Sequence, residues 1–131
     1  MKIHHIGYLV KNIKKSEKQF LSLGYKVEKA ASFDEYRKVN IEFLTKDGYR
    51  VELVEPIRDE SPVYALLKKF RNAPYHICYE TNDLNKELEN LTENHYVIMQ
   101  EPKLAPCIGN GDKKVAFLMS SNIGIIELLE E

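Results

Sequence analysis

The sequence contains an internal repeat, and this repeat limits the folds that the chain can adopt. Shifted by 71 residues, HIGYLVKNIKKSEKQFLSLGYKV, which starts at His5, lies over HICYETNDLNKELENLTENHYVI, which starts at His76. In each copy an alternating strand leads to an Asn or Asp, whose side-chain oxygen can accept a hydrogen bond from a backbone N–H in the first turn of a helix. Each copy therefore predicts a strand, a helix and a second strand.

The similarity continues at the end of each copy. VNIEFLTKDGYRVELVE, residues 39–55, predicts a β-hairpin by its alternation and its Asp47-Gly48 turn. KVAFLMSSNIGIIELLE, residues 114–130, repeats this pattern with a turn over residues 120–124. Each half then consists of a βαβββ module, and we expect an α+β protein.

A separate helix is expected to join the two halves. SPVYALLKKF begins with Ser61 as a cap and Pro62 at the first helical position, and its apolar residues fall on one face. At 131 residues the chain has the length of one ordinary domain. We expect this domain to contain a first module over residues 1–58, a linking helix over residues 61–71 and a second module over residues 73–131.

Composition excludes several classes of partner. The chain has 19 basic and 20 acidic residues and a net charge of −1, which gives no electrostatic reason to bind nucleic acid or an anionic membrane. No apolar run approaches the length of a membrane span, and no signal peptide is apparent, so we expect a cytoplasmic protein. The two cysteines, Cys78 and Cys107, lack CxxC spacing and are expected to be reduced.

Two histidines and two glutamates occupy corresponding positions in the two halves. His5 and His76 lie on the first strands, and Glu52 and Glu127 lie among apolar residues on the last strands. A carboxylate is costly to bury unless it is paired or bound to a metal. Taken singly, each residue could be a polar side chain at the edge of the core. Together they favour a divalent metal ion, and four ligands of an octahedral ion leave two positions for water or substrate oxygens.

Two other histidines are not expected to contribute ligands. His4 should face away from His5 by strand alternation, and His95 should lie on the surface near a helix end. Residues 101–114 contain two prolines and two glycines and are expected to form a long loop at the mouth of the site.

Four segments resemble the ligand strands of the vicinal oxygen chelate superfamily: HHIGYLV, YRVELVEP, PYHICYETNDL and VAFLMSSNIGIIELLEE. The resemblance covers essentially the whole chain. It implies a half-open, cup-shaped mixed β-barrel of two tandem βαβββ modules, with helices outside and a divalent metal ion such as Co, Ni, Zn or Mn inside. By this match the metal ligands are His5, Glu52, His76 and Glu127.

Within the superfamily, ELVEP, SPVYALLKKF and PYHICYETNDL resemble the methylmalonyl-CoA epimerases. This resemblance implies a metal that chelates the substrate, an acyl-CoA such as methylmalonyl-CoA, and carboxyl groups that remove and return its α-proton. Glu127 matches one of that family's acid/base residues. The second such position is Tyr36 in this chain, and the adjacent Glu35 is the candidate that a small loop shift could bring into the site.

Two alternatives remain open. Glyoxalase I uses the same His, Glu, His, Glu set on a hemithioacetal, although the turn MSSNIG here lacks the DPDG type of turn common in that family. A metal-free small-molecule binding or resistance protein usually lacks the ligand set altogether. The superfamily forms its sites within one chain or across a dimer, and we expect a homodimer.

Overall fold

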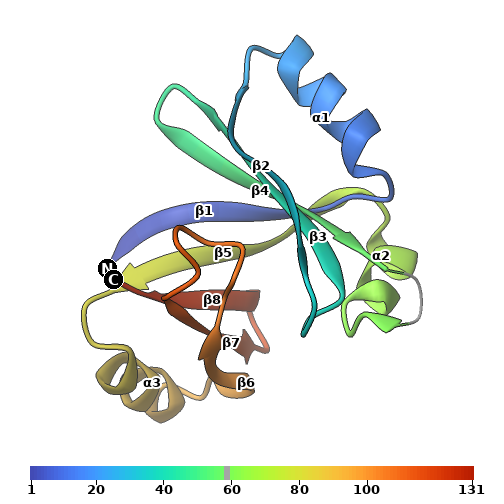
Figure 1. Cartoon of the computed structure of the whole chain (residues 1–131). Coiled ribbons are helices and arrows are strands. Elements are labelled where there is room, and N and C mark those ends of the chain that lie inside the picture. The colour runs from blue at the N-terminus through green and yellow to red at the C-terminus, as the bar shows by residue number, and fades with distance from the viewer. Residues whose placement is uncertain (58–59) are drawn as a thin grey trace. The chain divides into compact units, whose positions relative to one another are not determined.

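The computed structural model describes residues 1–57 and 60–131 and forms two compact units. Unit 1 consists of Met1–His5 together with Tyr75–Glu131, and unit 2 consists of Ile6–Pro74. The described elements, labelled in Figure 1, are β1 (Lys2–Leu9), α1 (Ile13–Ser22), β2 (Lys26–Asp34), β3 (Val39–Lys46), β4 (Tyr49–Pro56), α2 (Tyr64–Phe70), β5 (Ala73–Thr81), α3 (Leu84–Glu93), β6 (Val97–Leu104), β7 (Lys114–Ser120) and β8 (Gly124–Glu130).

The same strand topology occurs twice, which confirms the predicted repeat and the α+β class. In unit 2, β1 pairs in parallel with β4, β4 pairs antiparallel with β3, and β3 pairs antiparallel with β2. In unit 1, β5 pairs in parallel with β8, β8 pairs antiparallel with β7, and β7 pairs antiparallel with β6. In each βαβββ module the first strand pairs in parallel with the last strand, whereas the other pairs are antiparallel. Each module therefore forms a mixed sheet of four strands.

The two predicted helix starts are confirmed by their caps. The Asn12 Oδ1 atom accepts a hydrogen bond from the Lys15 backbone N–H at 3.0 Å, and α1 begins at Ile13, directly after Asn12. In unit 1, the Asp83 side chain accepts a hydrogen bond from Lys86 in the same way at 3.1 Å, before α3. These caps satisfy donors that the first turn of a helix leaves unpaired.

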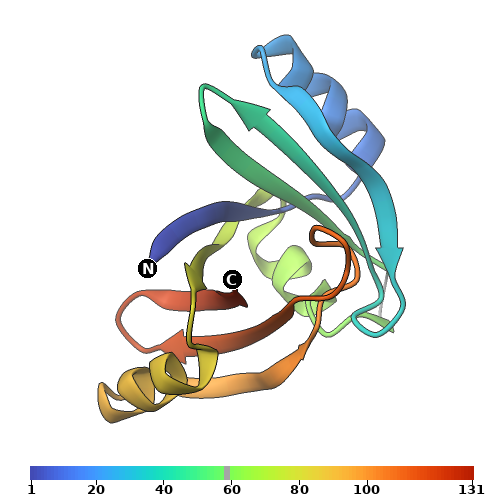
Figure 2. The ribbon, with the colours of Figure 1, turned by 60° about the vertical axis from the view of Figure 1, so that its left-hand side comes forward.

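Helix α1 packs on the sheet of unit 2 and helix α3 on the sheet of unit 1, so the face that each helix covers is the apolar one (Figure 2). In unit 1, α3 contributes Leu84 and Leu88, and Tyr79 of β5 packs against the same cluster. In unit 2, Ile13 of α1 and Tyr8 of β1 take the corresponding roles. Because side chains alternate along a strand, His5 of β1 and His76 of β5 lie on the opposite face from these tyrosines.

The start of α2 differs from the prediction of a helix over residues 61–71. The Ser61 hydroxyl donates a hydrogen bond to the Arg37 backbone carbonyl at 3.0 Å and accepts one from the Val63 N–H at 3.3 Å. Ser61 therefore forms a short turn and does not cap the helix, which begins at Tyr64 and ends at Phe70. Tertiary contacts of the hydroxyl thus override a local capping signal.

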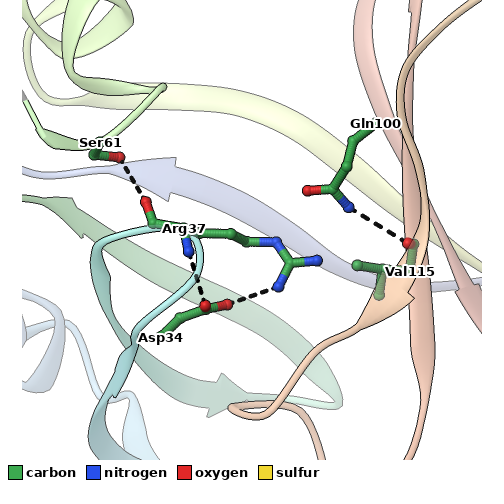
Figure 3. Close-up of polar contacts among 5 residues, drawn as sticks. All are labelled: Asp34, Arg37, Ser61, Gln100 and Val115. Carbon is green, nitrogen blue, oxygen red and sulfur yellow. Dashed lines mark hydrogen bonds and ion pairs between the residues drawn. The ribbon is translucent and has the colours of Figure 1, made fainter.

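The same contact joins Ser61 to the turn between β2 and β3. Asp34 at this turn is 1% exposed, and its carboxylate accepts hydrogen bonds from the Arg37 N–H at 2.9 Å and from Arg37 Nη1 at 2.8 Å (Figure 3). Asp34 is therefore a structural residue, since it fixes the turn that carries Glu35 and Tyr36.

The predicted loop over residues 101–114 is shorter in the structure. Strand β6 continues to Leu104, and Pro102 lies between Gln100 and Lys103, where the pairing with β7 shifts register. Proline is tolerated in a strand at such an irregularity because it has no N–H to donate to the ladder. The Gln100 side chain donates a hydrogen bond to the Val115 carbonyl at 3.5 Å across this irregular pairing (Figure 3).

None of the three helices in the described part of the chain is long and apolar enough to cross a membrane. Cys78 and Cys107 are both buried and form no disulfide bond among the described residues, as the sequence predicts.

Candidate metal centre

Three of the four predicted ligands converge in unit 1. They are His5 from β1, His76 from β5 and Glu127 from β8, and they are 1%, 4% and 3% exposed. The parallel pairing of β5 and β8 places Glu127 opposite Cys78, two residues after His76. Residues two apart share a face of a strand, so the register brings Glu127 to the face of the histidine.

The ligand atoms of these residues form a nearly equilateral triangle. Glu127 Oε1 lies 3.0 Å from His5 Nε2 and 3.2 Å from His76 Nε2, and the two Nε2 atoms are 3.2 Å apart. Two ligands at right angles, each about 2.1 Å from a metal ion, lie about 3.0 Å apart, whereas a tetrahedral ion separates them by about 3.4 Å. The observed separations fall between these two values or at the octahedral one, so the triangle is the size that three ligands of one metal ion require.

The electrostatics of the cluster suit a cation. Burial alone would raise the pKa of Glu127, but hydrogen bonds and charge interactions with His5 and His76 outweigh it and hold this pKa well below its usual value. A buried carboxylate oxygen that faces two imidazole nitrogens is a donor set that Zn, Co, Ni and Mn accept.

Aromatic rings surround the imidazole of His76. The ring centroid of Tyr75 lies 4.4 Å away and that of Phe117 lies 5.5 Å away, both edge-on. The His5 ring is also edge-on to His76, at 5.3 Å. Such packing limits the rotation of the ring, so Nε2 keeps its direction toward Glu127.

His4, which was not expected to contribute a ligand, contacts one of the candidate ligands. Its Nδ1 atom lies 2.8 Å from Nδ1 of His5, which is a hydrogen-bond distance. Alternation sets the direction of each Cβ atom, but an imidazole extends far enough beyond Cβ to meet the ring of the next residue. His95 is exposed just after α3, as predicted.

Glu52, the fourth predicted ligand, belongs to unit 2 and is 3% exposed on β4. Within that unit it pairs with Gly7 of β1 and with Phe43 of β3. Its assignment as a ligand stays a prediction.

Glu35, the predicted second acid/base residue, lies in the turn between β2 and β3 of unit 2. Its side chain is 80% exposed, and its carboxylate pairs with Lys38 Nζ at 2.8 Å. Tyr36 beside it is 56% exposed, and the Arg37 guanidinium carbon lies 5.6 Å from its ring centroid. The catalytic role of Glu35 stays a prediction.

A further buried carboxyl group was not found from the sequence. Glu42 on β3 is 2% exposed and pairs with Leu53 of β4, so it faces the helix side of its sheet, opposite to Glu52. Burial first, and then a hydrogen bond and charge repulsion from Glu17 of α1, raise the pKa of Glu42 to about 8. Its flanking residues, Ile41 and Phe43, resemble those of Glu52, and only the strand register separates the two glutamates.

Comparison with known proteins identifies the family of the chain. Residues 4–117 match the family model described as Glyoxalase/Bleomycin resistance protein/Dioxygenase superfamily. The chain belongs to this superfamily. Because the match spans both halves, the repeated βαβββ modules and their strand topology are those of the superfamily fold.

Individual relatives of this superfamily member include enzymes and a protein without a known role. An uncharacterised protein, YqjC, from Bacillus subtilis is 29% identical over 98% of the chain and 91% of its own length. The mitochondrial methylmalonyl-CoA epimerase of Bos taurus is 27% identical over 97% of the chain and 73% of its own length. The structure of Streptomyces coelicolor methylmalonyl-CoA epimerase in complex with 2-nitronate-propionyl-CoA has a TM-score of 0.82 at 23% identity and covers 100% of this chain and 97% of the other.

Proposed function

We propose that this superfamily member is a metal-dependent epimerase or related isomerase that removes a proton next to the carbonyl of an acyl-CoA such as methylmalonyl-CoA. The observation that carries the proposal is the buried triangle of His5, His76 and Glu127, whose atoms are spaced as ligands of one metal ion. The likeness to methylmalonyl-CoA epimerases supports the choice of reaction and substrate class.

We further propose that Glu52 completes the ligand set. In unit 2, Glu52 pairs with Gly7, two residues after His5, and in unit 1, Glu127 pairs with Cys78, two residues after His76. The repeat thus relates the two glutamates by the same register to the two histidines. A divalent cation bound by this set supplies a Lewis acid that polarises a carbonyl oxygen and favours the loss of the neighbouring proton.

The proton itself needs a carboxylate that accepts and returns it. Glu127, which resembles one of the acid/base residues of the methylmalonyl-CoA epimerases, is the first candidate for this role. Glu35 is the candidate for the second acid/base group. Its carboxylate forms an exposed ion pair with Lys38, and such a pair contributes little to stability, so a small shift of the turn can release it.

Glyoxalase I activity is the second candidate. By the resemblance, Tyr36 stands where the methylmalonyl-CoA epimerases carry a catalytic glutamate, which counts against the epimerase reaction and keeps glyoxalase I as the alternative. Both reactions remove a proton beside an oxygen that a metal polarises, so the ligands are common to the two activities.

Metal analysis of the purified protein tests the proposed centre. We expect the wild type to retain about one equivalent of Zn, Co, Ni or Mn after dialysis, and we expect His5→Ala and His76→Ala to retain far less. His95→Asn is the matched control, because it removes an exposed histidine and Asn tolerates the positive φ of 71° at this position. Equal metal content in the wild type and the two alanine variants would favour a metal-free binding protein.

Assembly and location also belong to the proposal. We expect a cytoplasmic homodimer, and sedimentation of the metal-loaded protein at micromolar concentration measures its mass. A monomeric mass combined with full metal content would place the complete ligand set within one chain.

A further inference from the structure

His4 and His5 are adjacent in β1, and their rings interact directly. The two Nδ1 atoms are 2.8 Å apart, and the ring centroids are 5.1 Å apart at an interplanar angle of 78°. A neutral imidazole carries one N–H and one lone pair, so one ring donates this hydrogen bond and the other accepts it. His5 is buried whereas His4 is partly exposed, so His4 can exchange its own proton with solvent more readily.

The spacing favours a hydrogen bond over a second metal site. Ligand atoms of His4, His5 and Cys78 lie within 4.8 Å of one another, which is close enough for a soft metal ion to be considered. Two nitrogen ligands of one ion, however, lie about 3.0 Å apart in an octahedral site and about 3.4 Å apart in a tetrahedral one. The observed 2.8 Å between the two Nδ1 atoms is instead the length of an N–H···N hydrogen bond.

We infer that His4 is a positioning residue for the metal centre, which accepts a hydrogen bond from Nδ1–H of His5 and so leaves the lone pair of His5 Nε2 directed at the cluster. The inference rests on the proposed metal centre. His5 Nε2 lies 3.0 Å from Glu127 Oε1, and in the other tautomer it would donate its proton to that carboxylate. A protonated Nε2 cannot bind a metal ion, so the acceptor on His4 favours the tautomer that can.

The assignment also fixes the state of His4. If Nδ1 of His4 accepts the hydrogen bond, its proton lies on Nε2. Outer-sphere partners of this kind typically change metal affinity by about 10- to 100-fold, because they set the tautomer and the orientation of the ligand ring.

The test compares metal affinity in two substitutions at one position. His4→Phe keeps a ring of similar size but removes the acceptor, and His4→Asn replaces Nδ1 with an amide oxygen that can accept. Competition with a chromophoric chelator measures the Kd for Zn²⁺. We expect Kd to rise about 10- to 100-fold in His4→Phe. We expect His4→Asn to recover most of that loss, and His95→Asn, the surface control, to match the wild type. Chemical denaturation of the metal-free proteins tests whether His4→Phe is folded as stably as the wild type.

A spectroscopic measurement checks the tautomer independently of affinity. In the Zn²⁺-loaded wild type, the side-chain ¹⁵N shifts of His4 should show a protonated Nε2 and an unprotonated Nδ1. A His4 that carries its proton on Nδ1, or a Kd that is the same in wild type and His4→Phe, would overturn the inference while leaving the metal centre intact. A wild type that binds no Zn²⁺ would instead refute the proposed metal centre, and the inference with it.

Discussion

Glu42→Gln should stabilise the protein at neutral and basic pH and should make its stability less dependent on pH. Glu42 is 2% exposed, and its pKa is raised from 4.5 to about 8, first by burial and then by the hydrogen bond and charge of Glu17. The folded state thus binds the Glu42 proton more tightly than the unfolded state does. The favourable contribution is fully present below pH 4.5 and is lost as the pH rises toward 8.

The magnitude follows from the width of this window. Each pH unit between the two pKa values lowers the free energy of unfolding by about 1.4 kcal/mol. Between pH 5 and pH 7 the loss is about 3 kcal/mol. Glutamine does not titrate, and its amide can still donate a hydrogen bond to Glu17, so the variant lacks this loss.

Urea denaturation of the wild type and Glu42→Gln at pH 5, 6, 7 and 8 measures the effect. Both proteins are kept metal-free with a chelator, because metal ligands also titrate in this range. The difference in unfolding free energy between them should grow in favour of the variant as the pH rises. Glu89→Gln on the exposed side of α3 is the matched control and should show no such trend. A difference between wild type and Glu42→Gln that is the same at every pH would refute the reasoning.

Three further predictions concern the ligand set, the helix cap and the metal-bound state. Glu127→Gln keeps the shape of the side chain but removes its charge, so Zn²⁺ affinity measured by chelator competition should fall at least about 10-fold; unchanged affinity would remove Glu127 from the ligands. Asn12→Ala removes the hydrogen bond to the Lys15 N–H and should lower the free energy of unfolding by about 1 kcal/mol in urea, whereas no loss would show that water replaces the cap. Saturating Zn²⁺ should raise the Tm of the wild type but not that of His76→Ala, and an equal rise in both would indicate binding elsewhere.

The elements that the sequence predicted correctly are those fixed by short-range signals. The caps at Asn12 and Asp83 and the Asp47-Gly48 turn each depend on a few neighbouring residues, and both residues of this turn have the positive φ that such a hairpin needs. The repeat then related the two halves, so a candidate ligand on one strand indicated the corresponding candidate in the other half.

The errors arose where distant or side-chain contacts decide the structure. Ser61 has the character of a helix cap, but its hydroxyl binds Arg37, which is far away in the sequence. Pro102 indicated a loop, and the irregular pairing of β6 accommodates it in a strand. The strand pattern indicated a buried carboxyl group at Glu52 but did not indicate one at Glu42. Glu42 is buried on the face of the sheet that α1 covers, and the sequence does not show which face that is.

The most direct test of the proposed function is proton exchange at the α-carbon of methylmalonyl-CoA in D₂O, followed by ¹H NMR. We predict that the metal-loaded protein catalyses deuterium incorporation, that a chelator abolishes it, and that added divalent metal restores it. His76→Ala should be inactive under all three conditions. Exchange that survives chelation, or turnover of a glutathione hemithioacetal with no exchange in methylmalonyl-CoA, would contradict the proposal.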